Sequence, residues 1–201
     1  MTVPSMSFGL KQLFLSHTWK PDEEGRDTHS RAKQLAKVLT SIGWSVWLDE
    51  TDMKNNTDAS MASGIDNAQA VIMLVTREYA HKINHSARHT NNDNCLKEFG
   101  YALFREKFVV PVVFERSMLD QGTWSPGVFS MRLSSFLYID GSDDVVTAAL
   151  RIHDHLLKNG KTPQIWRHRP ILRRRSRRVM LTELYQRTIR PLWPPEKCVR
   201  L

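Results

Sequence analysis

The run AVIMLVT at residues 70–76 constrains the fold more than any other feature of the chain. Its first six residues are all apolar, so a strand formed here has no polar face to turn toward water. A strand that is apolar on both faces is typical of the centre of a parallel sheet, where helices cover both sides. The run therefore predicts an α/β protein.

Shorter apolar runs and helical patterns alternate around this central run. Further strands are predicted at 12–17, 44–50, 108–114 and 135–140, and helices at 29–42, 57–67, from about 94 onward, and at 143–157. Gly43 ends the first helix, and Thr57 can cap the second. The polar stretch NHSARHTNND (84–93) is expected to break the helical region that follows residue 76.

Five strands joined by helices predict a flavodoxin-like, open, five-stranded parallel sheet with helices on both faces and right-handed crossovers. Pro111 lies within the fourth strand and has no amide hydrogen for a ladder. We therefore expect this strand to lie near an edge of the sheet or at a bulge.

Length and composition agree with one soluble domain: 201 residues, 41% of them hydrophobic and 25% charged. No apolar run approaches the roughly 20 residues of a membrane helix, and the first residues lack the pattern of a signal peptide. Two cysteines, Cys95 and Cys198, provide no disulfide framework and fit a reducing compartment. We expect a cytoplasmic protein.

The net charge of +8 is concentrated at the C-terminal end, where residues 161–201 carry 12 Lys/Arg against 2 Asp/Glu. We divide the chain into an N-terminal extension (1–9), a domain (10–158) and a basic tail (159–201) compatible with one short amphipathic helix. The tail's arginine cluster fits an anionic membrane, a nuclear localisation signal or a nucleic acid, and a solvated tail is the simpler alternative. The cluster consists of Arg173, Arg174, Arg175, Arg177 and Arg178.

Ligands of open parallel sheets bind beyond the carboxyl ends of the strands, where the strand order reverses. For the order 2-1-3-4-5, that point lies between the first and third strands. The first strand ends at Ser16 and His17, the second ends at Asp49, and the third leads toward the helix that carries Glu98. The sequence therefore predicts a polar site at this edge of the sheet.

Glu98 is the acid that the helical pattern sets beside the core in NDNCLKEFGYAL (92–103). Leu96, Phe99 and Leu103 form an apolar stripe, and Glu98 falls roughly 90° from its centre. This predicts a carboxylate at the margin of the core, facing a crevice and only partly desolvated. A solvated acid paired with a neighbouring basic residue is the simpler alternative.

Several blocks of sequence, in one order, resemble a TIR domain (Toll/interleukin-1 receptor fold) from about residue 10 to residue 157. They are LFLSH (13–17), GWSVWLDETDM (43–53), SMASGIDNAQAVIMLVT (60–76), DNCLKEF (93–99), VVPVVFE (109–115) and FLYIDG (136–141). The resemblance implies the TIR fold and self-association through TIR domains.

Many TIR domains cleave NAD+ to nicotinamide and ADP-ribose or a cyclic form of it, and the resemblance implies the same activity here. The family's catalytic glutamate falls on Glu98. Plant-like members often have tryptophan where this chain has Asn94. The resemblance assigns NAD+ binding to Ser16, His17, Trp19, Asp49, Asn94 and Cys95. It also implies a BB loop, which is an assembly segment in which glycine is frequent. Here the loop consists of Asp52, Met53, Lys54, Asn55 and Asn56.

One carboxylate suits this chemistry. Glycosidases usually need a second one to protonate the leaving group, but the nicotinamide of NAD+ is cationic and leaves neutral. Glu98 then has to stabilise an oxocarbenium-like ribose electrostatically. No GxGxxG follows a strand, so NAD+ is expected as a substrate and not as a bound cofactor.

Two other chemistries find less support. His81, His85 and His89 have helical spacing, but their segment is interpreted as a loop and no cysteine or acid completes a set, so we expect no metal site. A response-regulator receiver would carry its aspartate at the end of the third strand, where this chain has Val75 and Thr76.

Ser16 and His17 are neighbours on a strand and point to opposite faces, which argues against a Ser-His hydrolase pair. Two hypotheses for the function remain. The first is an NAD+ glycohydrolase in signalling or defence that is active on assembly, and the second is a non-catalytic adaptor that binds other TIR domains. A third hypothesis is a scaffold docked through the basic tail.

Overall fold

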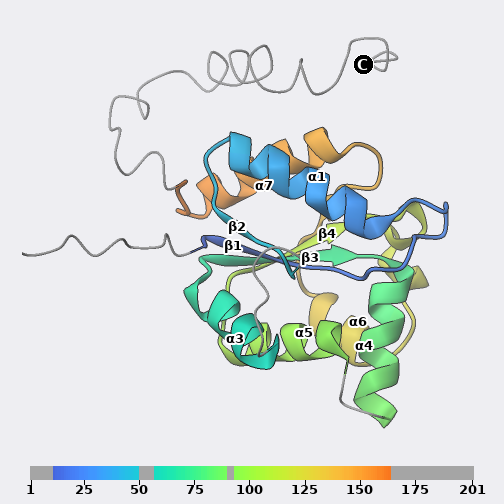
Figure 1. The fold of residues 1–201 in the computed structure, drawn as a ribbon. Helices are drawn as coiled ribbons and strands as arrows, with labels where there is room; N and C mark the ends of the chain where they lie inside the picture. The colour runs from blue at the N-terminus through green and yellow to red at the C-terminus, as the bar shows by residue number, and fades with distance from the viewer. Residues whose placement is uncertain (1–10, 50–56, 90–92, 164–201) are drawn as a thin grey trace, which may run out of the picture.

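The computed structural model describes residues 11–49, 57–89 and 93–163, and these form one open sheet with helices on both faces (Figure 1). The sheet has five strands in the order β2-β1-β3-β4-β5, and every pair is parallel. This confirms the predicted strand order and the α/β fold class.

The strands are short, and the longest of them lies at the centre. β3 consists entirely of buried residues, as its unbroken apolar run predicts. β2 and β5 contain two residues each, so the apolar runs at 44–50 and 135–140 extend well beyond the paired strands. The bounds are β1 Leu13–Ser16, β2 Val46–Trp47, β3 Ala70–Val75, β4 Val109–Val113 and β5 Ile139–Asp140.

Helices α1 and α7 cover one face of the sheet, and α3, α4, α5 and α6 cover the other (Figure 1). Aspartates at 27, 93 and 144 cap α1, α5 and α7 by accepting hydrogen bonds from backbone amides of the first turn. The bounds are α1 Thr28–Ser41, α3 Thr57–Asn67, α4 Arg77–His89, α5 Asn94–Phe104, α6 Val128–Leu133 and α7 Val145–Lys158, with short 3₁₀ turns at Arg116–Met118 and Gln121–Thr123.

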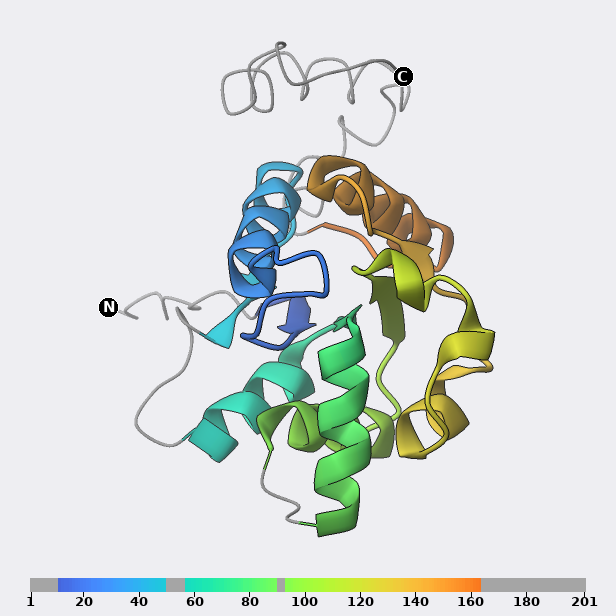
Figure 2. The ribbon, with the colours of Figure 1, turned by 90° about the vertical axis from the view of Figure 1, so that its right-hand side faces the viewer.

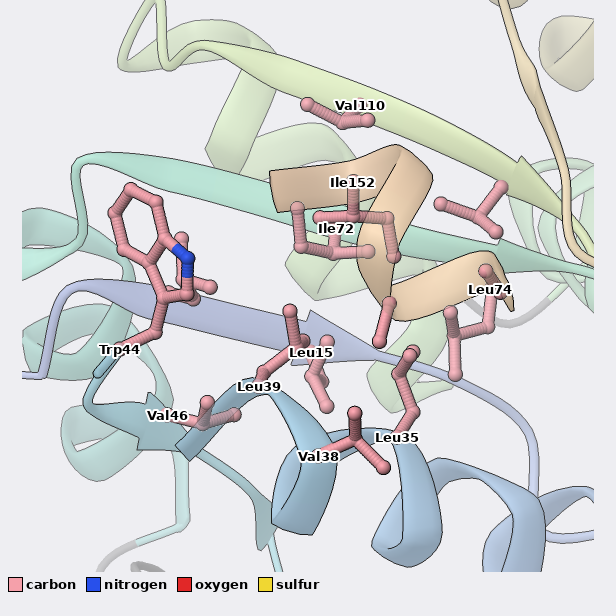
Figure 3. Packing of buried hydrophobic residues seen from close by; sticks show 14 of the residues in the cluster. Leu15, Leu35, Val38, Leu39, Trp44, Val46, Ile72, Leu74, Val110 and Ile152 are labelled. Atoms are coloured by element: carbon pink, nitrogen blue, oxygen red, sulfur yellow. The ribbon is translucent and has the colours of Figure 1, made fainter. Parts of the chain in front are cut away.

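The sheet separates two hydrophobic cores. Figure 3 shows the core beneath α1 and α7, where Leu15 and Ile72 of the sheet meet Leu35 and Leu39 of α1. In the opposite core, the rings of Phe14 and Trp47 are stacked with their centroids 4.2 Å apart. Because alternate residues of a strand point to opposite faces, residues 14 and 15 of β1 belong to different cores.

Helix α4 differs from the prediction, because it continues through residues 84–89. Ile83 and Asn84 are buried, and Asn84 Oδ1 accepts a hydrogen bond from the amide of Phe129, 3.0 Å away at the start of α6. This contact with a distant segment supports the helix where the local sequence is polar. The predicted break at 84–93 is therefore wrong over residues 84–89.

The expectation that the strand with Pro111 lies near an edge of the sheet is confirmed, because β4 is next to the edge strand β5. β4 itself is not the edge strand, since it lies between β3 and β5. The ladder between β4 and β5 has only two pairs, which begin at Val112, so Pro111 lies before the point where β5 joins. Proline is tolerated at this position because no residue of β5 is paired there, so its missing amide hydrogen leaves no ladder hydrogen bond unmade on that side.

Three sequence predictions fall on residues outside those described: the N-terminal extension, the BB loop at 52–56 and the arginine cluster of the tail. Within the described residues, no helix is long and apolar enough to cross a membrane.

Candidate functional site

The site lies at the carboxyl ends of β1 and β3, where the strand order reverses (Figure 2). β1 ends at Ser16, β2 lies beside it, and α4 begins two residues after β3 ends. Polar side chains at the ends of these strands are therefore carried to one edge of the sheet, as the predicted order requires.

The loop between β1 and α1 is anchored by a buried ion pair. Asp22 accepts hydrogen bonds from Arg26 Nε at 2.7 Å and from Arg31 Nη1 at 3.0 Å. Arg31 also donates to the carbonyl of Phe114 at 2.9 Å, directly after β4. These contacts tie the loop to the end of β4, so the side chains that the loop carries have a fixed position.

Glu98 lies on the buried side of α5 and is only 6% exposed. Its Oε2 accepts a hydrogen bond from Ser16 Oγ at 2.6 Å. The helical pattern predicted a position beside the core but only partial desolvation. The tertiary fold buries the carboxyl group more deeply, because α5 packs it against the end of β1.

Tyr79 extends this contact into a short chain of hydrogen bonds. Its hydroxyl lies 2.8 Å from Ser16 Oγ and is fully buried. Ser16 has a single hydroxyl hydrogen, which it gives to Glu98, so Tyr79 donates to Ser16. Sequence reasoning missed Tyr79; the pattern gives only its place near the start of α4, on the side that carries Ile83.

Burial raises the pKa of Glu98 from an ordinary value of 4.5 to about 8. The negative charges of Asp49 and Asp93 contribute to this rise, whereas the hydrogen bond from Ser16 and the positive charge of Lys82 oppose it. The loss of water around the charged form is the largest cause. In the free protein at neutral pH, Glu98 is therefore mostly protonated.

A second cluster occupies the other face of the sheet. His17 Nε2 lies 2.8 Å from His29 Nδ1 and 4.0 Å from Asp49 Oδ1. Trp19 donates from its indole nitrogen to Asp49 Oδ2 at 2.6 Å and stacks on His29 with the ring centroids 3.9 Å apart. Ser16 and His17 thus serve opposite faces, as the alternation along a strand predicts.

The pKa of His17 falls from 6.5 to about 4; burial is the largest cause, and the neighbouring His29 contributes to the fall. Asp49 and the backbone at Leu15 act in the opposite direction without reversing the shift. The imidazole of His17 is therefore neutral across the physiological pH range.

The first turn of α5 carries the two remaining predicted binding residues. Asn94 is exposed, whereas Cys95 is buried and its thiol lies 3.5 Å from the carbonyl of His17. Burial raises the pKa of the Cys95 thiol, so it stays protonated and can donate to that carbonyl. Cys95 thereby holds α5 against the end of β1.

An open pocket of about 450 Å³ lies between α3 and α5, and Glu98 is one of its lining residues. Met61, Ile65 and Phe104 make much of its wall apolar. Lys97 and Asp58, which form a salt bridge at 3.0 Å, supply charge at its edge. Glu98 thus belongs both to this pocket and to the polar contacts at the end of β1.

The family model described as TIR domain matches residues 13–157, which is most of the chain. The protein belongs to the TIR domain family. A search of curated proteins finds no match to the chain. Membership identifies a signalling or defence role, and TIR domains act in general by associating with one another.

Within this TIR domain, the predicted residues form two groups at one edge of the sheet: Ser16 contacts Glu98 on one face, and His17 and Trp19 contact Asp49 on the other. The predicted assembly residues, Asp52, Met53, Lys54, Asn55 and Asn56, lie outside the described residues. Their roles in binding and assembly stay predictions.

One premise of the metal-site prediction is wrong, namely that the segment with His81 and His85 is a loop. His81 and His85 lie on α4 and not in a loop, with stacked rings 5.6 Å apart. Among the described residues, the group of His, Cys, Asp and Glu that could hold a metal ion is a different one: His17, His29 and Asp49. Sequence reasoning missed His29, because only the fold brings the start of α1 to the end of β1.

Proposed function

We propose that this TIR domain is an NAD+ glycohydrolase that cleaves the bond between nicotinamide and ribose. The observation that carries the proposal is the environment of Glu98. The carboxyl group of Glu98 is buried at the switch point of the sheet and is held by Ser16 at 2.6 Å, and Glu98 is one of the residues that line a pocket of about 450 Å³. Glu98 is also the residue on which the catalytic glutamate of NAD+-cleaving TIR domains falls.

The proposed reaction needs no general acid, since nicotinamide leaves as a neutral molecule. Positive charge develops on the ribose as the bond breaks, and the carboxylate of Glu98, which is itself shielded from most water, stabilises it. Water then attacks the anomeric carbon and gives ADP-ribose, or the adenine of the same molecule attacks and gives a cyclic product.

The raised pKa of Glu98 sets a condition on this mechanism. The residue is mostly protonated in the free protein at neutral pH, but the reaction requires the carboxylate. The bound nicotinamide carries a positive charge, and an opposite charge within a few ångströms lowers the pKa of a carboxyl group. Substrate binding and ionisation of Glu98 therefore favour each other.

We assign the remaining residues by their place around Glu98. Ser16 orients the carboxylate, and Trp19, which is 55% exposed, offers an indole face for stacking. His17 and Asp49 lie on the other face of the sheet, beyond the ends of β1 and β2, and Asn94 and Cys95 lie at the start of α5. The BB loop of a neighbouring copy completes the site on assembly, as the family resemblance implies.

A non-catalytic adaptor is the second candidate, and one observation favours it. Glu98 is only 6% exposed, and a buried, protonated carboxyl group can be a purely structural member of the core. In that case, the protein acts through association with other TIR domains.

The deciding experiment measures the release of nicotinamide by chromatography. Purified full-length protein is incubated with NAD+ at high protein concentration, with and without a crowding agent or anionic vesicles. We expect release by the wild type and a loss of at least about 100-fold in Glu98→Gln, the magnitude that a single electrostatic stabiliser supplies.

Glu106→Gln is the matched control, because it makes the same chemical change at an exposed position just beyond the same helix. Circular dichroism checks that each variant is folded. If the wild type releases no nicotinamide in any of these conditions, the glycohydrolase is refuted. Light scattering with and without a second TIR domain then tests the adaptor.

A further inference from the structure

Three side chains from separate segments converge beside the end of β1. His17 follows β1, His29 is the second residue of α1, and Asp49 comes two residues after β2. One nitrogen from each imidazole and one carboxylate oxygen all lie within 4.8 Å of one another. Two imidazoles and one carboxylate form a common ligand set of zinc sites that keep one position open.

We propose that His17, His29 and Asp49 bind a zinc ion. His17 and Asp49 are also assigned to the proposed NAD+ site, but the inference does not require NAD+ cleavage, since it rests on the geometry of this cluster.

The two distances from His17 fit an ion after small shifts, and the His29 and Asp49 ligand atoms lie within 4.8 Å of each other. Zinc–nitrogen bonds of 2.0–2.1 Å in a tetrahedron place two ligand atoms about 3.3–3.4 Å apart. The His17 and His29 nitrogens are 2.8 Å apart, so they must separate by about half an ångström. Asp49 Oδ1 is 4.0 Å from His17 Nε2 and must approach by a similar amount.

The proton that the two imidazoles share in their hydrogen bond can move when a metal ion binds. At 2.8 Å, one nitrogen donates and the other accepts. When the ion binds, the donating ring transfers its proton to its other nitrogen, so both facing nitrogens become ligands and both rings stay neutral. The ion with one carboxylate then carries a net charge of +1, and water fills the fourth position.

Trp19 supplies the outer support that zinc ligands usually have. Its indole nitrogen donates to Asp49 Oδ2 at 2.6 Å, which leaves Oδ1 as the oxygen nearer to His17. Its ring lies almost parallel to that of His29, with an interplanar angle of 12°. Partners of this kind fix the orientation of ligands and usually contribute 10- to 100-fold in metal affinity.

The test is a calorimetric titration of Zn²⁺ into full-length, tag-free protein from which metal has been removed by dialysis against a chelator. We expect one zinc ion per chain. His29→Asn and Asp49→Asn should each weaken binding by at least about 100-fold, because a lost ligand costs no less than a lost outer partner. The double variant His81→Ala/His85→Ala is the matched control and should bind as the wild type does.

The variant Trp19→Phe tests whether the outer hydrogen bond to Asp49 contributes to zinc affinity, as it does in an evolved metal site. Phenylalanine keeps a ring on His29 but removes the hydrogen bond to Asp49, so we expect affinity to fall by about 10- to 100-fold. X-ray absorption of the zinc-loaded wild type should show a shell of nitrogen and oxygen with two imidazoles, and this measurement needs no variant to fold.

Three results would overturn the proposal: no stoichiometric binding, loss of binding in the His81/His85 variant, or a zinc shell that contains sulfur.

Discussion

Replacing Glu98 with glutamine is expected to stabilise the protein at alkaline pH and to change its stability little near pH 5. The pKa of Glu98 rises to about 8 in the folded state, chiefly because burial penalises the carboxylate. The unfolded chain releases this proton near the ordinary value of 4.5. Between these two values the folded state binds more protons, so the stability of the wild type falls as the pH rises.

The size of the effect follows from the two pKa values. Each pKa unit corresponds to about 1.4 kcal/mol, so the interval from 4.5 to about 8 sets an upper limit of about 5 kcal/mol. Glutamine resembles the protonated acid in shape and can accept the hydrogen bond from Ser16, but it has no charge to desolvate. The advantage of the variant should therefore grow from about pH 5 and level off above pH 8.

The assay is urea unfolding of the wild type and Glu98→Gln at intervals from pH 5 to pH 9. Glu106→Gln, an exposed change beyond the same helix, reports how much of any trend comes from removing one surface charge. Ser16→Ala tests the direction of the pKa shift a second time. The hydrogen bond from Ser16 favours the carboxylate form of Glu98, so its loss should raise the pKa of Glu98 further. The pH range over which stability falls should then extend to higher pH. A difference between wild type and Glu98→Gln that is independent of pH, or one that favours the wild type at pH 9, would refute the reasoning.

Two further predictions follow from the same structure. If Glu98 must lose its proton to act, kcat/KM for NAD+ should increase with pH and level off near pH 8; a profile that is flat from pH 6 to pH 9 would contradict this role. Gly64→Ala should destabilise the protein by about 1–3 kcal/mol, because its Cβ would lie 2.9 Å from the indole nitrogen of the buried Trp47. Gly100→Ala, on α5 with no atom within 4 Å of a new Cβ, should instead stabilise it by up to about 1 kcal/mol, and thermal unfolding of the pair checks both signs.

The candidate site divides into a part that the sequence could predict and a part that it could not. Ser16, Asp49 and Glu98 were expected at one edge of the sheet, because parallel strands bring their carboxyl ends together. Tyr79 and His29 were missed, since each lies on a helix whose local pattern says nothing of its partner. The contacts Tyr79–Ser16 and His29–His17 join residues 63 and 12 positions apart.

Helix α4 shows the same division within the fold. The polar residues 84–89 carry weak helical signals, and the sequence alone suggested a loop. Asn84 makes the difference, because its side chain caps the amide of Phe129, 45 residues further along the chain. The sequence around Asn84 does not include Phe129, so a prediction from local sequence could not anticipate the contact and had no basis for extending the helix.

The sequence by itself determined the order of strands and helices along the chain, because an unbroken apolar run and alternating helices predict a parallel sheet covered on both faces. The strand order β2-β1-β3-β4-β5 was that of the flavodoxin-like class, which this pattern favours. The sequence also placed Glu98 beside the core through helical spacing. Only the tertiary structure decided how deeply that carboxyl group is buried and therefore where it titrates. The physical reason is that desolvation depends on what the rest of the chain packs around a group, which here is the end of β1, 82 residues away from Glu98 in the sequence.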